Sequence, residues 1–409
     1  YQSLSSLDPL TSYVSDDYFG FLDDNEDINV NLPAPLLDLG IGRIPARTLT
    51  QAKNVVNKIL SYHLQSSFGP WRSNMTFVAD DEDFNLHIND AEQHAALVDN
   101  ASSYWNLKKI YLDAFPQEGG TSGSFYPTVN TAITKDINRG TLVWNYSGHG
   151  SSSRLAQESI LDKNMISTWE NNSQLPLFIT ATCDFAPFDD PSQFSIGEEL
   201  LMSRPTGAIG LMTTTRLVFA SSNKIINNNF LAALLAKDLQ GKVAYLGDAL
   251  KKAKNNTVQN TGDYINARKF VMLGDPAMKP GIPEYGVKTV SINGKPFGVM
   301  PDTLKALSLY EFSGEVNRPD GSLASDFNGD VYPQLFDKPL LIGTLGNDPQ
   351  SRKTDFSSSS SLLYNGKVRA QNGKFSFSFI APGDLNLATG KGRLSYYTNN
   401  ENYDAAGGT

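Results

Sequence analysis

The sequence predicts an α/β domain with a mostly parallel sheet flanked by helices, followed by an immunoglobulin-like β-sandwich. Between about residues 50 and 280, apolar β-rich runs alternate with helical patterns, and this alternation is typical of parallel sheets. Most of the runs are continuously apolar, as expected for strands covered on both faces. After residue 281 the helical patterns stop and short β runs with turn signals follow.

The α/β part contains six expected strands and six expected helices. Its first helix is predicted over 50–62, where apolar residues recur at helical spacing and Thr50 is the expected cap. The expected strands are 75–79, 109–112, 141–146, 177–182, 208–213 and 270–273. The remaining helices are expected at 91–104, 129–138, 196–202, 223–237 and 244–254.

The first 48 residues are rich in loops and contain one expected strand, at 36–41. One strand and one helix cannot bury themselves, so we expect residues 1–68 to end a first α/β subdomain whose upstream part is missing. Residues 69–281 then form the catalytic α/β subdomain and 282–409 the sandwich. We also expect the native protein to continue beyond both ends of this chain.

The sandwich is predicted from short β runs and from two hairpin turns, Asp320-Gly321 and Asn372-Gly373. The serine run 357–361 is expected to be a flexible loop. The glycine-rich segment 118–123 is expected to be a mobile loop, because it lacks the lysine and the strand-to-helix context of a phosphate-binding loop. The expected strands are 288–292, 307–316, 330–336, 340–345, 374–380 and 393–397.

Composition excludes several classes of function. The chain has 34 Lys and Arg against 43 Asp and Glu, with no basic run, so nucleic acid and anionic membrane surfaces are not expected partners. No apolar run approaches the ~18 residues of a membrane helix. A single cysteine excludes a disulfide scaffold. The low charged fraction, 19%, and many Phe and Tyr residues resemble an exported bacterial protein.

Two polar residues follow expected neighbouring strands at the edge of the sheet where ligands bind. His149 lies between two glycines after 141–146, and Cys183 directly follows 177–182. A histidine beside a cysteine can take the thiol proton, and the thiolate is the nucleophile. The backbone N–H groups of Gly150 and Cys183 are candidate oxyanion donors. The alternative, a buried filler cysteine and a structural histidine, stays open on spacing alone.

Several ordered motifs resemble the gingipain family of cysteine peptidases. They are Tyr-Ser-Gly-His-Gly-Ser at 146–151, Thr-Ala-Thr-Cys at 180–183, and Leu-Gly-Asp-Pro at 273–276. Gly-Ile-Gly-Arg-Ile-Pro at 40–45, Gly-Glu-Glu-Leu-Leu at 197–201 and Gly-Ala-Ile-Gly at 207–210 extend the match. The resemblance implies a caspase-like α/β fold, an immunoglobulin-like sandwich after it, and cysteine peptidase activity.

Carried onto this chain, the resemblance implies that Cys183 is the nucleophile and His149 the general base and acid. Asp81 is our choice for the carboxylate that orients the His149 ring, with Asp80 the next candidate and a solvated acidic loop the alternative. Asp90 is the candidate for binding a basic P1 side chain.

No cofactor is expected to be required for catalysis. The chain has no HExxH motif or cysteine cluster, so we expect no metal at the catalytic site, including at His87 and His94. The resemblance leaves structural calcium open at 80–83 and at Asp184, Asp189 and Asp190.

Two stretches, Asp-Asp-Tyr-Phe-Gly at 16–20 with 22–24, and 183–191, resemble the sortase branch of the family. That branch implies a Bacteroidetes-like type IX secretion system. Its sortase is exported to the outer-membrane cell surface, removes the C-terminal sorting domain of secreted cargo and transfers the cargo to anionic lipopolysaccharide through a cysteine thioester. Outer-membrane secretion-system proteins are the implied partners. A secreted endopeptidase without transpeptidation and a non-enzymatic surface scaffold remain the alternatives.

Overall fold

The computed structural model describes residues 12–28, 34–121, 123–298, 303–385 and 388–409. Its α/β part is built on a six-stranded sheet in the order β10-β9-β8-β5-β1-β2, in which only the β10–β9 pair is antiparallel. The fold class predicted from the sequence is therefore confirmed for this part. The strands are β1 (Asn74–Ala79), β2 (Asn106–Tyr111), β5 (Val143–Ser147), β8 (Leu177–Ala181), β9 (Gly210–Thr214) and β10 (Phe270–Leu273).

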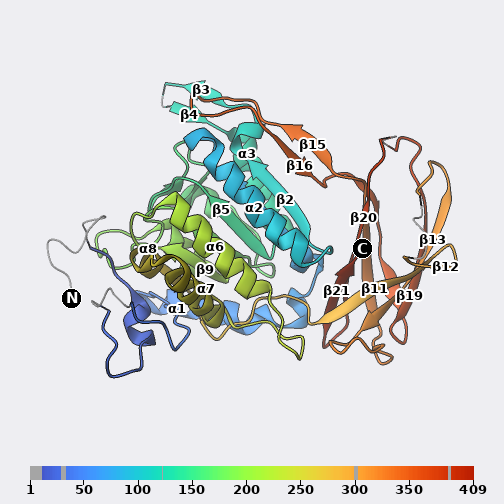
Figure 1. Cartoon of the computed structure of the whole chain (residues 1–409), viewed down its shortest axis with the longest axis horizontal. Helices are drawn as coiled ribbons and strands as arrows, with labels where there is room; N and C mark the ends of the chain where they lie inside the picture. Colours follow the sequence, from blue (N-terminus) through green and yellow to red (C-terminus); the bar gives the residue numbers. More distant parts are fainter. Residues whose placement is uncertain (1–11, 29–33, 122, 299–302, 386–387) are drawn as a thin grey trace.

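Helices cover both faces of this sheet (Figure 1). On one face, strand residues such as Phe77 and Met212 pack with α2, α6, α7 and α8. On the other face, Trp144 and Phe178 pack with α1, α3 and the segment of α4, α5 and the π-helical turn η6. The helices are α1 (Leu49–Tyr62), α2 (Leu86–Ala101), α3 (Pro127–Arg139), α4 (Lys163–Ile166), α5 (Ile196–Glu198), η6 (Glu199–Ser203), α6 (Ala220–Leu235), α7 (Leu246–Thr261) and α8 (Tyr264–Lys269).

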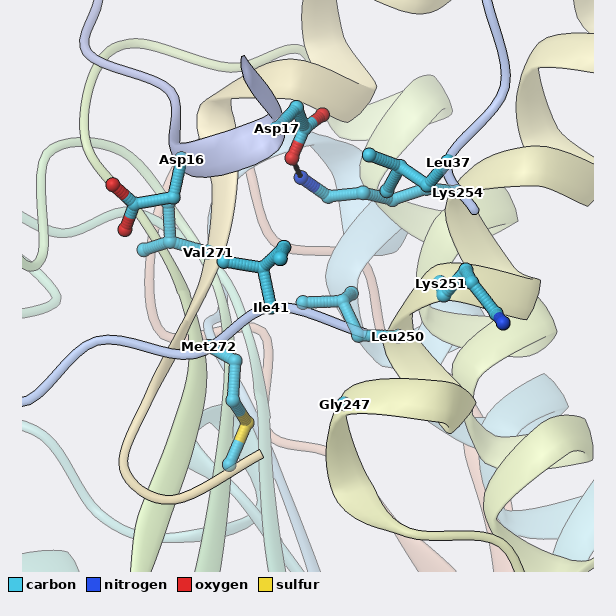
Figure 2. A pocket seen from close by; sticks show the side chains of 10 residues that line it. All are labelled: Asp16, Asp17, Leu37, Ile41, Gly247, Leu250, Lys251, Lys254, Val271 and Met272. Atoms are coloured by element: carbon cyan, nitrogen blue, oxygen red, sulfur yellow. Dashed lines mark hydrogen bonds and ion pairs between the residues drawn. The ribbon is translucent and has the colours of Figure 1, made fainter. Parts of the chain in front are cut away.

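The described part of the N-terminal segment packs against α7 and β10 through the 3-10 helix η1 (Asp16–Gly20). Figure 2 shows the ion pair of Asp17 with Lys254, whose atoms are 2.5 Å apart and buried. Asp16 forms an ion pair with Arg43, and the backbone of Arg43 forms a parallel β-bridge with Leu273 of β10. The Asp-Asp-Tyr-Phe-Gly stretch at 16–20 therefore packs the N-terminal segment against the α/β core through these two ion pairs.

Two expectations for this segment are wrong. No strand forms at 36–41, because the backbone N–H and C=O of Leu37 bond to the side chain of Asn255 on α7 instead. Helix α1 is capped by Thr48 rather than Thr50, in a reciprocal capping box with Gln51.

The C-terminal part is a nine-stranded sheet that folds onto itself. The described strands run in the order β17-β14-β20-β21-β11-β13-β19, with β12 and β18 at its side. Its ends face one another, since the rings of Tyr364 on β17 and Phe377 on β19 stack 5.2 Å apart. A sandwich-like region is thus confirmed. Its strands are β11 (Tyr285–Ile292), β12 (Lys295–Pro296), β13 (Leu309–Asn317), β14 (Gly329–Phe336), β17 (Leu362–Asn365), β18 (Val368–Ala370), β19 (Lys374–Ile380), β20 (Arg393–Asn399) and β21 (Asp404–Gly408).

Turn chemistry explains part of this region. Asn372 and Gly373 both have positive φ, 51° and 75°, and they join β18 to β19 as the predicted hairpin turn. The glycine-rich segment forms a hairpin of β3 (Glu118–Gly120) and β4 (Gly123–Phe125), where a mobile loop was expected.

One hairpin leaves the β-rich region and reaches the α/β part. It consists of β15 (Leu340–Gly343) and β16 (Asp355–Ser358), and it runs past β2 towards α3 (Figure 1). We call residues 340–358 the arm. Part of the serine run expected to be a loop belongs to its second strand. Among the described residues, no helix is both long and apolar enough to cross a membrane.

Candidate active site

The ends of β5 and β8 bring His149 and Cys183 to one cavity. The two strands pair in parallel, with Ser147 opposite Ala181, so both residues lie two positions beyond a matched pair of strand ends. They line the same cavity of about 150 Å³, together with side chains from α2 and α6. The structure therefore places the two sequence-predicted residues at the carboxyl edge of the sheet, where parallel sheets form their sites.

The loop carrying His149 is held from below by Asp80 and Tyr146. The His149 backbone N–H donates to the Asp80 carboxylate at 2.8 Å, and the Tyr146 hydroxyl donates to the His149 carbonyl at 2.7 Å. Both flanking glycines are required by space. A Cβ at Gly148 would lie 2.4 Å from the Tyr146 hydroxyl, and one at Gly150 would lie 2.6 Å from Thr182 Oγ1.

The His149 ring faces two carboxylates, Glu82 and Asp83, that were not predicted from the sequence to orient it. Its Nε2 lies 3.1 Å from Asp83 Oδ2 and 3.5 Å from Glu82 Oε2, and the ring packs edge-on against His87 with centroids 5.1 Å apart. Asp83, Phe84 and Asn85 have consecutive positive φ of 56°, 55° and 66°, an uncommon run for residues other than glycine. This turn folds the acidic loop back over the ring.

Asp81, which was predicted to orient the His149 ring, does not lie beside that ring in the structure. Its carboxylate is fully buried and accepts a 2.5 Å hydrogen bond from the Tyr126 hydroxyl, and none of its hydrogen bonds or ion pairs involves the His149 ring. The chain after β1 continues inward through Asp80 and Asp81 and turns back only at Asp83. Asp80, the second candidate, supports the loop backbone and not the ring.

Cys183 is half-buried, and its thiol donates a 3.5 Å hydrogen bond to the carbonyl of Val218. Burial raises the pKa of the Cys183 thiol, Asp184 raises it further, and the Val218 hydrogen bond and the Lys269 charge lower it. Asp184 has a φ of 46°, so the chain turns sharply directly after the cysteine. The resting thiol therefore holds its proton at neutral pH and needs a base to become a nucleophile.

Two backbone amides are free to act as oxyanion donors. Hydrogen bonds from Ala156 N–H to the His149 carbonyl and from Ser151 N–H to the Arg154 carbonyl hold the chain on both sides of Gly150. Within the described parts of the chain, neither the Gly150 N–H nor the Cys183 N–H donates to a protein acceptor. Both amides lie beside the strand ends that carry the catalytic candidates.

Asp90, on α2, lines the same cavity but already has a partner. Its Oδ1 lies 3.6 Å from Lys224 Nζ, on α6. Burial raises the pKa of Asp90, and the Lys224 charge lowers it. Lys224 was not predicted from the sequence, because nothing in a helical pattern shows which lysine faces a cavity.

The other residues considered as metal ligands include two buried histidines and two aspartates that have partners in the chain. Burial lowers the pKa of His87 and that of His94 to about 4, so both rings are neutral. Asp189, expected as one candidate calcium ligand, pairs with Arg216 at 2.6 Å. Asp190 accepts hydrogen bonds from the Ser192 hydroxyl and the Gln193 amide, whereas Asp184 Oδ1 is buried without a hydrogen-bond partner.

Comparison with known proteins identifies the family and the fold. The model of peptidase family C25 matches residues 1–281. A search of the curated proteins finds no match. The structure is similar to the Arg-specific cysteine proteinase gingipain R (RGPB), with 16% identity and a TM-score of 0.55, covering 97% of this chain and 78% of that chain. It is equally similar to the Porphyromonas gingivalis complex of RgpB pro- and mature domains, with 16% identity, a TM-score of 0.55, and 96% and 80% coverage.

A third similar structure is dimeric latent PorU from Porphyromonas gingivalis, with 20% identity and a TM-score of 0.37; the match covers 97% of this chain and 31% of that chain. The gingipain structures confirm the fold, and the family model covers more than half of the sequence. The chain therefore belongs to peptidase family C25, the gingipain family of cysteine peptidases.

Proposed function

We propose that this protein is a cell-surface cysteine endopeptidase and transpeptidase that acts through Cys183 and His149. The observation that carries the proposal is the meeting of these two residues at one cavity, at the ends of paired strands. Free amides at Gly150 and Cys183 complete the set that acyl transfer needs.

In the proposed first step, His149 takes the proton of Cys183, and the thiolate attacks the scissile carbonyl carbon. The amides of Gly150 and Cys183 hold the oxyanion. The C–N bond then breaks, His149 gives its proton to the leaving amine, and the acyl group remains on Cys183 as a thioester. Asp83 and Glu82 stabilise the protonated His149 ring during this transfer.

In the second step a new nucleophile loses its proton to His149 and attacks the thioester, and the sulfur leaves. Water gives hydrolysis, whereas an amine gives transpeptidation. We propose the amine of a surface lipopolysaccharide as acceptor and the C-terminal sorting domain of a type IX cargo as the leaving group. Support comes from the sequence of 16–20, 22–24 and 183–191, which resembles the sortase branch. Export to the outer-membrane surface and contact with secretion-system proteins are part of the same proposal.

Asp90 is the proposed P1-facing residue. Because Lys224 already offsets its charge, a basic P1 side chain must compete with Lys224 for this carboxylate. We therefore propose a weaker preference for basic P1 residues than an unpaired carboxylate at that position gives.

The test is product analysis with a cargo protein that carries its sorting domain, with and without an added amine. Mass spectrometry of the new carboxyl end is expected to show the amine adduct when amine is present. A plain carboxyl end under both conditions rejects transpeptidation and leaves the endopeptidase. Cleavage that continues in Cys183→Ala and His149→Ala rejects both and favours the scaffold. Ser360→Ala, in the exposed loop that follows the arm, is the matched control and should cleave normally.

A further inference from the structure

The side chain of Asn85 is bonded in an unusual way for its position at the start of α2. Asn85 is the N-cap residue of this helix, and an N-cap asparagine usually accepts a hydrogen bond from one of the first free backbone N–H groups. Here the side chain makes no capping bond. Its Oδ1 instead accepts from the Arg352 N–H at 2.8 Å, and its Nδ2 donates to the Arg352 carbonyl. Both ends of a buried side chain thus bind the backbone of the arm.

Asn85 ends a turn whose backbone conformation is costly. Asp83, Phe84 and Asn85 all have positive φ, a region that residues with a Cβ enter at a steric cost. Such a run persists only where the surrounding structure holds it. The arm supplies a second contact as well, because the Arg352 guanidinium lies over the Phe84 ring, 5.0 Å from its centroid. Two of the three residues of the turn are therefore held by one residue of the arm.

The arm is fixed to the α/β part independently of this turn. The Asp113 carboxylate is fully buried and accepts from the backbone N–H groups of Gly346 and Asn347 at 3.0 and 2.8 Å. Further along the arm, the buried Phe356 ring packs against Tyr111 of β2, with centroids 4.7 Å apart. Because neither contact involves residues 83–85, the backbone that Asn85 binds belongs to a hairpin that is already anchored.

We propose that the arm is a positioning element of the active site, which holds Asp83 against His149 through the bonds between Asn85 and Arg352. Asp83 lies two residues before Asn85, and its carboxylate is 3.1 Å from His149 Nε2. When these bonds are lost, the turn can relax towards ordinary backbone conformations, and this carries the carboxylate away from the ring. The β-rich region thereby acts on cleavage through the acidic turn and not through substrate. The inference deepens the proposed function, and its effect on turnover rests on that function.

Asn85→Gly separates the contact with the arm from the backbone preference of position 85. Glycine enters the left-handed region more easily than asparagine, so the substitution keeps the turn accessible while it removes both bonds to Arg352. Asn372→Gly is the matched control, because Asn372 also has a positive φ, 51°, but is exposed in the β18–β19 hairpin. Asn85→Asp keeps the acceptor for the Arg352 N–H and is expected to fall between the parent and Asn85→Gly.

The first test reports on the contact between Asp83 and His149 without catalysis, in Cys183→Ala protein. Diethylpyrocarbonate modifies accessible imidazole nitrogens, and peptide mass spectrometry gives the rate at each histidine. Asn85→Gly is expected to raise the rate at His149 about threefold, because Nε2 is then no longer covered by the Asp83 carboxylate. His63, exposed at the end of α1, is the internal reference and should keep its rate. Asn372→Gly should leave both rates unchanged.

The second test measures turnover with Cys183 intact. Asn85→Gly is expected to lower kcat about fivefold with KM within about twofold, since Asp83 acts on the His149 ring and not on bound substrate. In an Asp83→Asn background the same substitution should lower kcat by less than about twofold, because residues that act through one another are not additive. Replacing residues 345–353 by Asn-Gly closes the hairpin after the Thr344–Thr354 hydrogen bond and should lower kcat at least as much.

Equal rates of His149 modification in the parent and in Asn85→Gly would show that the turn holds itself, and would overturn the proposal whether or not the protein cleaves cargo. A changed modification rate with an unchanged kcat would overturn the positioning role as well. The same loss of kcat with and without the Asp83 carboxylate would assign Asn85 to general stability and overturn it too. Cleavage that persists in Cys183→Ala rejects the proposed function instead, and the modification rate still decides whether the arm holds Asp83.

Discussion

Two charged neighbours act on the Cys183 thiol in opposite directions. Asp184 raises the pKa of Cys183 and Lys269 lowers it, against a background of burial that raises it. Since the thiolate is the reactive form, a raised pKa lowers reactivity at neutral pH, and reactivity is gained as pH rises towards that pKa. The chain has one cysteine, so any alkylation reports on Cys183 alone.

We predict that Asp184→Asn increases, and Lys269→Gln decreases, the rate at which iodoacetamide alkylates Cys183 at pH 7, each by about threefold. Asparagine tolerates the positive φ of position 184, so the turn is kept. The measurement is the alkylation rate against pH, in which Asp184→Asn shifts the curve to lower pH and Lys269→Gln to higher pH. Rates that move in the same direction in both variants would contradict this electrostatic account.

The Asp83 carboxylate is the nearest acid to the His149 ring, at 3.1 Å. We predict that Asp83→Asn lowers kcat by about tenfold with KM within about twofold, because the Asp83 charge stabilises the positive ring formed when His149 takes the thiol proton. Glu82→Gln, whose carboxylate is 3.5 Å from the ring, is the comparison and should lose less. Steady-state kinetics decide it. A rise in KM with kcat unchanged would assign Asp83 to substrate binding instead.

At the scale of elements, the turn after β5 is restricted by the side chains of Tyr146 and Asp80, which pack against it. The space beside Gly148 is filled by the Tyr146 hydroxyl and by Asp80, whose Cβ would lie 2.5 Å from an added methyl group. We predict that Gly148→Ala lowers the free energy of unfolding by about 1–3 kcal/mol and displaces His149. Gly119→Ala is the control, because nothing lies within 4 Å of its added Cβ.

Denaturant unfolding of both glycine variants provides the measurement. Gly119→Ala should stay within about 0.5 kcal/mol of the parent. A Gly148→Ala protein as stable as the parent would show that the Tyr146–Asp80–His149 contacts yield easily and do not fix the loop.

The sheet and its strand ends were predictable because fully buried parallel strands are continuous apolar runs, as in 177–182. The placement of His149 and Cys183 at the same edge of the sheet could be predicted because each follows the carboxyl end of such a strand. Which acid reaches the ring did not, because the three successive left-handed residues at 83–85 carry no sequence signal beyond Asp83 and Asn85 themselves. The strand predicted at 36–41 failed for a related reason: an asparagine side chain on a distant helix takes the backbone bonds of Leu37.

At the scale of the whole molecule, the α/β and β-rich parts share contacts at several places, and two of them involve nearly fully buried charged side chains, Arg72 and Asp113. Arg72, which is almost fully buried, pairs with Asp404 of β21 at 2.8 Å. The arm makes the second contact, where the backbone N–H groups of Gly346 and Asn347 donate to the Asp113 carboxylate. These partners are far apart in the sequence, so neither contact was predictable from local pattern. The arm also reaches the loop after β1, where the Ser351 hydroxyl donates to the Asp81 carbonyl.

The central claim is that Cys183 carries the acyl group during cleavage. The most direct measurement is the intact mass of the protein after mixing with cargo and rapid acid quenching. We predict a mass increase equal to the acyl portion of the cargo, located on Cys183, removed by hydroxylamine and missing in Cys183→Ala. Cargo that is cleaved with no adduct at any time point, and equally by Cys183→Ala, would contradict the account.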